Sequence, residues 1–152
     1  MKKILLIALA CSCFLFAQNP GVSIPHGLVF AIGSPGSGTA LTTSSQSATL
    51  TIPFGCTIGS PAPSRYSIAL GAGDSGTLTV KFWKIAGGTA IPTVTNVINT
   101  SGLSLATGTA VQSSTFSDFT ATTVTANDMM IMNITAISGT IDSVLVVLPC
   151  GS

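Results

Sequence analysis

The side chains that could support catalysis are few. His26 is the single histidine, and the 152 residues contain no glutamate. A Ser-His-Asp relay would need His26, but no serine stands in a nucleophile-elbow pattern. Paired-carboxylate chemistry would have to use four aspartates, of which Asp74 and Asp128 lie in turn sequences where Asp bonds its own backbone. We therefore predict that the protein is not an enzyme and has no catalytic residues.

Motifs for metals and cofactors are equally weak. Asp74-Ser75-Gly76 is not part of an Asp-x-Asp-x-Asp-Gly calcium loop. The glycine-rich run at 33–38 is not a phosphate cradle, because no helical pattern follows it. We expect no cofactor and no metal.

Aromatic side chains are the remaining residues that could bind a ligand. Trp83, the only tryptophan, lies in a run of alternating residues and points away from the apolar face of that run. An exposed Trp83 with Tyr66 nearby could stack on a sugar ring or anchor a protein interface. The alternative is that both faces of the sheet are covered and Trp83 belongs to the core. Tyr66 and Trp83 are the candidate ligand-binding residues.

The elements that must position these residues are strands. Residues 77–85 alternate with period two, and 129–137 and 141–148 form two further strands, expected to make a hairpin around Ser138-Gly139-Thr140. Turn sequences rich in glycine, serine and asparagine separate the segments. The pattern predicts an all-β protein, a single β-sandwich of jelly-roll type with about eight strands. Weaker strand candidates are 28–32, 48–52, 66–70, 93–98 and 119–125.

Composition excludes two classes of protein. Hydrophobic residues make up 46% of the chain and charged residues only 6%. Disordered chains show the opposite balance. Five Lys and Arg residues cannot form a phosphate-neutralising face, so we expect no nucleic-acid partner.

The first 17 residues are typical of a signal peptide. Lys2 and Lys3 precede an apolar run, and Ala17 is a plausible residue before the cleavage site. Lipoprotein processing at Cys11, an uncleaved anchor and a buried N-terminal helix are the alternatives. We expect export to the extracellular space, the cell surface or the periplasm. The mature chain would carry three basic residues against four aspartates, and it contains no run long enough to span a membrane.

Two cysteines, Cys56 and Cys150, remain after cleavage. An even number of cysteines in an exported chain predicts one disulfide, with two separate buried thiols as the alternative. Residues 18–47 combine a strand with a Gly/Ser/Thr-rich linker, ahead of a sandwich domain at 48–152. That strand either folds back onto its own domain or completes the sheet of a neighbouring copy.

Several runs resemble a known domain. They are 51–58 (Thr-Ile-Pro-Phe-Gly-Cys-Thr-Ile), 72–77 (Ala-Gly-Asp-Ser-Gly-Thr) and 80–84 (Val-Lys-Phe-Trp-Lys), with 91–93, 96–98 and 126–128. Together they resemble a β-sandwich domain of bacteriophage tail-fibre and other structural proteins, over roughly residues 48–148. The resemblance implies a non-catalytic module for assembly or surface attachment. The export signal points to a secreted bacterial relative of that module.

These observations favour a secreted structural or adhesive surface protein that self-assembles as a homo-oligomer or filament. Two alternatives are a carbohydrate-binding module that takes a surface glycan and a virion-associated phage attachment protein.

Overall fold

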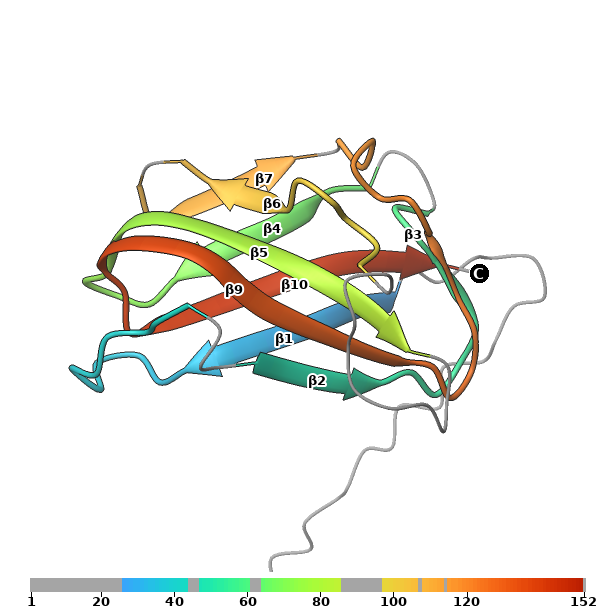
Figure 1. Cartoon of the computed structure of the whole chain (residues 1–152), viewed down its shortest axis with the longest axis horizontal. Helices are drawn as coiled ribbons and strands as arrows, with labels where there is room; N and C mark the ends of the chain where they lie inside the picture. The colour runs from blue at the N-terminus through green and yellow to red at the C-terminus, as the bar shows by residue number, and fades with distance from the viewer. Residues whose placement is uncertain are drawn as a thin grey trace, which may run out of the picture.

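The computed structural model describes residues 26–43, 47–60, 64–85, 97–106, 108–113 and 115–151, apart from the side chains of His26 and Ser47. Ten strands form two antiparallel sheets in this part of the chain, with no helix among the described residues (Figure 1). The predicted β-sandwich is therefore confirmed, with ten strands instead of about eight. The predicted signal peptide lies outside the described residues. No described helix could span a membrane.

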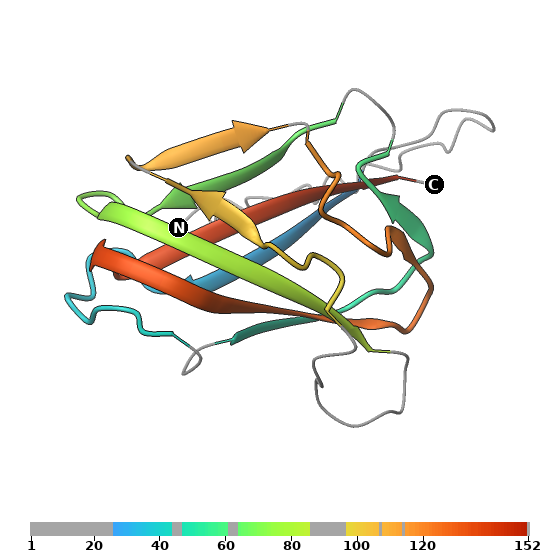
Figure 2. The same cartoon turned by 45° about the horizontal axis from the view of Figure 1, so that its top comes forward.

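The larger sheet is built around the C-terminal strand, β10. On one side β10 pairs along its length with β1, and on the other side it pairs first with β4 and then with β3. In Figure 2, β1 lies at one margin of this sheet and β7 at the other. Its strands are β1 (His26–Gly33), β3 (Cys56–Ile58), β4 (Tyr66–Leu70), β7 (Ala110–Ser113), β8 (Thr123–Val124) and β10 (Ser143–Gly151).

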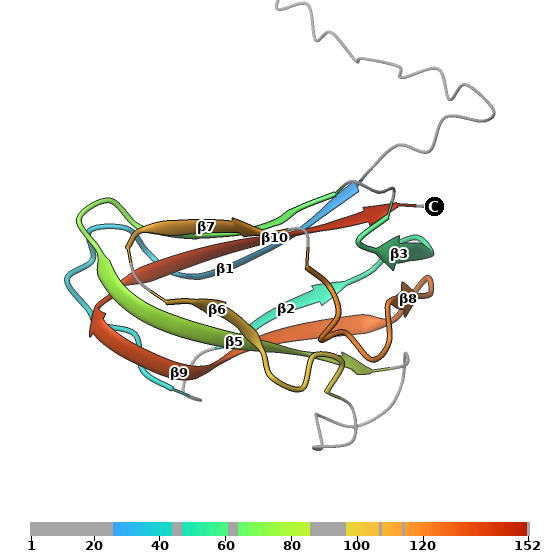
Figure 3. The ribbon, with the colours of Figure 1, turned by 90° about the horizontal axis from the view of Figure 1, so that it is seen from above.

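The smaller sheet is dominated by a long antiparallel ladder between β5 and β9, which a bulge at Thr79/Val80 interrupts. Figure 3 shows this sheet as a second layer beneath the larger one. Alternate residues of each strand face the other sheet, so the apolar face predicted in residues 77–85 is buried. The strands are β2 (Ser47–Thr51), β5 (Ser75–Ile85), β6 (Leu103–Leu105) and β9 (Met129–Thr140).

The predicted hairpin around Ser138-Gly139-Thr140 is wrong. β9 runs on to Thr140 in the smaller sheet, and the chain then crosses through Ile141 and Asp142 to β10 in the larger sheet. Gly139 pairs with Gly76 inside the β5–β9 ladder, where a side chain would meet the Ser75 carbonyl oxygen at 2.4 Å. The glycine thus permits close backbone approach within a strand instead of forming a turn.

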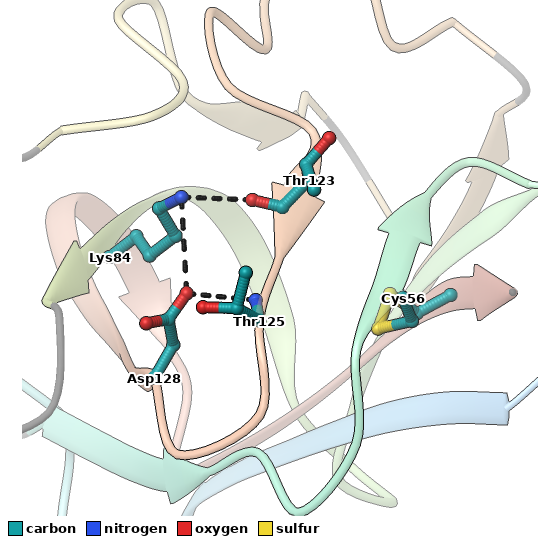
Figure 4. The surroundings of a disulfide bond; sticks show 6 residues. Cys56, Lys84, Thr123, Thr125 and Asp128 are labelled. Atoms are coloured by element: carbon teal, nitrogen blue, oxygen red, sulfur yellow. Dashed lines mark hydrogen bonds and ion pairs between the residues drawn. A yellow bond between two sulfur atoms is a disulfide. The ribbon is translucent and has the colours of Figure 1, made fainter.

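The predicted disulfide is confirmed. Cys56 of β3 and Cys150 of β10 are bonded, and both are buried (Figure 4). Near this end of the sandwich, Lys84 donates to the Thr123 carbonyl oxygen at 2.9 Å and lies 3.9 Å from Oδ2 of Asp128. The disulfide thus joins β3 to β10, and Lys84 joins the end of β5 to β8.

Candidate functional site

The two candidate ligand-binding residues are not brought together. Tyr66 lies on β4 of the larger sheet, is 7% exposed, and packs edge-on against Phe116 with ring centroids 5.6 Å apart. Trp83 lies on β5 of the smaller sheet. Tyr66 is therefore part of the core, and the two rings do not form a joint stacking surface.

Trp83 is half-buried on the outer face of the smaller sheet, on the side that alternation predicts. It stands opposite Ile131 of β9 and forms an isolated bridge with Val97. Ile131 and Ile85 on the same face are buried but stand outside the main core cluster. Trp83 therefore belongs to a small apolar group on this face.

No catalytic arrangement is visible in the described part of the chain. The backbone of His26 pairs with Cys150 at the start of β1, and the His26 side chain lies outside the described residues. No group of three or more His, Cys, Asp or Glu side chains gathers among the described residues. The non-enzyme expectation stays a prediction.

Asp118 accepts hydrogen bonds from a neighbouring turn. Its carboxylate accepts hydrogen bonds from the backbone N–H groups of Ser101 and Gly102, the shortest at 2.9 Å, and from the Thr100 hydroxyl at 3.2 Å. Burial raises the pKa of Asp118, but these donors outweigh burial and hold the pKa below its usual value. Asp118 is a structural acceptor for the turn before β6.

The most distinctive surface is the free edge of β1. In an antiparallel pair, each residue turns its backbone N–H and C=O to the same side, and the side alternates along the strand. The carbonyl groups of Ser143 and Pro149 accept from Gly71 and Gly59, so the odd-numbered residues of β10 face away from β1. The even-numbered residues of β10 therefore bond β1.

The register then fixes which residues of β1 face outward. Phe30 pairs with Val146, so the even-numbered residues of β1 complete the ladder with β10. Gly27, Val29 and Ala31 direct their N–H and C=O groups to the other side, where the described residues offer them no hydrogen-bond partner. Three donors and three acceptors on consecutive odd positions thus form an open template for another strand.

The face of the larger sheet next to this edge is apolar. Val29 is 53% exposed and Leu145 is 43% exposed, and they are the exposed large hydrophobic residues of the described chain. β1, β4, β7 and β10 contain no lysine, arginine or aspartate. An open groove of about 450 Å³ runs into this face, lined by residues that include Ala31, Gly33, Pro35, Ala69, Gly71 and Leu145.

Comparisons with protein-family models, curated proteins and solved structures found nothing that matches this chain.

Proposed function

We propose that this protein is an exported, non-catalytic β-sandwich that serves as a structural or adhesive surface protein and associates with copies of itself through β1. The open edge of β1 carries this proposal. β-sheet proteins normally protect their edges with short strands, charges, prolines or bulges. β1 has eight residues and an unbroken register with β10, and it contains no charged residue other than the titratable His26 and no proline.

A second copy is the partner that fits this edge. Two β1 strands paired antiparallel about a two-fold axis would join two six-stranded sheets into one continuous sheet. The uncharged outer faces would become contiguous, and a mature charge of three basic residues against four aspartates offers little repulsion. Each outward N–H of one β1 would find a carbonyl on the other.

Edge addition fits the structure better than exchange of β1 between copies. Leu28, Phe30 and Ile32 are each no more than 5% exposed and belong to the core of their own chain. Exchange would require β1 to leave that core, which exposes all three side chains until another copy receives them. We infer that β1 stays in place and that copies meet through its free side.

The disulfide is compatible with export, because such bonds persist in oxidising compartments. The alternatives from sequence, glycan binding and a virion-associated role, gain no specific support from this geometry. Trp83 is half-buried, and no aromatic contact joins it to another ring among the described residues.

Sedimentation velocity on the protein secreted from cells that express the full chain tests the proposal. We expect the weight-average sedimentation coefficient to rise with concentration across the micromolar to millimolar range. A single monomeric species throughout that range would contradict self-association.

A further inference from the structure

The groove on the outer face of the larger sheet begins at the free edge of β1. Its lining residues come from the end of β1, from β10 and from the end of β4, so it crosses the sheet inward from the β1 margin. Gly33 pairs with Ser143, and the Gly71 N–H donates to the Ser143 carbonyl oxygen. Three small residues thus lie next to one another across these strands, beside the exposed Leu145.

The groove suits a short apolar segment. Its volume of about 450 Å³ lies within the range of about 300–1,000 Å³ for pockets that bury small ligands. Apolar atoms dominate its lining, and the lining residues include no charged side chain. A charged group would lose its water there without gaining a partner, whereas aliphatic side chains would be stabilised by burial.

The geometry of paired β1 strands brings one segment of a second copy to this groove. The outward N–H and C=O groups of Gly27, Val29 and Ala31 are satisfied together when Val29 faces Val29 of the second copy about a two-fold axis. Gly27 then faces Ala31 of the second copy. Continued by two residues, the same register places Pro25 opposite Gly33 of the second copy.

Pairing between the two strands stops at that point. Pro25 has no N–H to donate. β1 ends at Gly33, where a φ of 80° turns the chain out of the extended conformation. The residues before Pro25 therefore meet the second copy where its groove begins.

The segment that arrives there is the N-terminal arm, residues 18–25 (Gln-Asn-Pro-Gly-Val-Ser-Ile-Pro). It follows the predicted signal peptide and lies outside the described part of the chain. The arm contains no charged side chain, and Val22 and Ile24 are its aliphatic residues. Its composition therefore matches the uncharged, apolar lining of the groove.

We propose that the groove receives the N-terminal arm of the second copy, so that two exchanged arms complete each β1–β1 contact. This inference rests on the proposed association through β1. An arm reaches the groove of its own chain less readily. The path from His26 back to Gly33 spans about 23 Å, and the arm fully extended spans about 26 Å, which leaves almost no length for the reversal.

Sedimentation equilibrium on the secreted parent and its variants measures what the groove contributes to association. Ala69→Asp places a charge in the groove lining and should weaken association roughly tenfold. Ser67→Asp is the matched control, because Ser67 lies two residues away on the same face of β4 but outside the lining. It adds the same charge and should associate as the parent does.

A change in the arm tests the other side of the contact. Val22→Ser combined with Ile24→Ser removes the two aliphatic side chains of the arm without adding charge. The double variant should also weaken association roughly tenfold. Because both positions precede β1, the pairing groups of β1 itself stay intact.

Cysteine crosslinking identifies the occupant of the groove. Secreted Val22→Cys protein is mixed with an epitope-tagged Leu145→Cys protein and oxidised. The expected product is a covalent dimer of one tagged and one untagged chain, seen on a non-reducing gel. Thr135→Cys replaces Leu145→Cys in the control, because Thr135 is exposed on β9 of the smaller sheet, and it should give far less of this product.

The outcomes separate the arm from the edge. If the parent associates but neither Ala69→Asp nor the Val22/Ile24 variant weakens association, or no Val22–Leu145 dimer forms, the exchanged arm is wrong and association through β1 stands. A crosslink that forms only within single chains carrying both cysteines also overturns the exchange, because the arm then occupies its own groove. A parent that does not associate overturns both proposals.

Discussion

Phe30 and Phe82 meet edge-on across the two sheets, with ring centroids 5.1 Å apart and ring planes at 66°. Phe30 comes from β1 and Phe82 from β5, and neither is more than 1% exposed. Edge-to-face pairs of this kind stabilise a core beyond the area that they bury. This contact holds β1, a strand at the edge of the larger sheet, against the smaller sheet of its own chain.

Phe30→Ala should therefore lower the free energy of unfolding by about 3–5 kcal/mol. Val29→Ala is the control, because Val29 is the next residue along β1 but is exposed, and its cost should stay below about 0.5 kcal/mol. Urea denaturation followed by far-UV circular dichroism measures both. Equal, small effects at the two positions would mean that β1 is not packed into its own core.

The Cys56–Cys150 disulfide closes a segment of 94 residues. Replacing Cys56 and Cys150 with alanine should lower the free energy of unfolding by roughly 2–5 kcal/mol, because the unfolded chain regains the entropy that the bond removes. Thermal unfolding measures the loss. Thiol titration of the unreduced, denatured chain of residues 18–152, which lacks Cys11 and Cys13, should find no free thiol, and two free thiols would contradict the disulfide.

Asn99 is fully buried and fills a gap in the hydrogen bonding of β5. Its Oδ1 accepts from the backbone N–H of Phe82 at 2.6 Å. Asn99→Ala would leave that buried N–H without an acceptor, at a cost of about 1–3 kcal/mol. Asn133→Ala is the comparison, because Oδ1 of Asn133 has no partner to lose. Chemical denaturation should separate the two variants, and an equal cost would contradict this role of Asn99.

The Asp118 carboxylate makes stability depend on pH. Its pKa is lower in the folded chain than the unfolded value of about 3.9, so folding favours the ionised form. The stabilisation is complete above the unfolded pKa and is lost as the pH falls through the lower folded-state pKa. Asp118→Asn should reduce stability at pH 7 by about 1 kcal/mol and flatten its decline below pH 4. Denaturation midpoints from pH 7 to pH 2 check this, and an unchanged acid decline would contradict it.

Alternation along the chain is enough to predict the long strands. In β5, the buried Leu78, Val80 and Phe82 alternate with less buried residues over enough positions to identify both the strand and its buried face. Trp83 lies on the predicted outer side. The three-residue strands β3 and β6 escape prediction, because three residues cannot establish a period. Their neighbours in the sheet, β10 and β5, hold them in place.

Which strands pair with one another is harder to predict from the sequence than where the strands lie. β9 and β10 are consecutive and β-rich, yet they lie in opposite sheets. Alternation also predicts that Tyr66 and Trp83 lie on strands, but it does not predict that these strands belong to different sheets. The hydrogen bond from the Asp142 N–H to the Asp74 carboxylate depends in the same way on the topology of the turns.

Proline substitution tests the open edge of β1 most directly. Ala31 directs its N–H away from β10, so Ala31→Pro removes a donor from the free edge and leaves the β1–β10 ladder intact. The backbone N–H of Leu70 in β4 donates to the Thr109 carbonyl oxygen, so the odd-numbered residues of β7 direct their backbone groups to β4. Gln112 is even-numbered and therefore directs its N–H away from β4, as Ala31 does from β10. Gln112→Pro thus blocks the opposite margin of the same sheet.

The decisive measurement is size-exclusion chromatography with light scattering on the secreted parent, Ala31→Pro and Gln112→Pro proteins over a range of concentrations. We predict that the parent and Gln112→Pro form dimers or larger assemblies as the concentration rises, while Ala31→Pro stays folded and monomeric. A parent that is monomeric at every concentration, or an Ala31→Pro protein that assembles like the parent, would contradict association through β1.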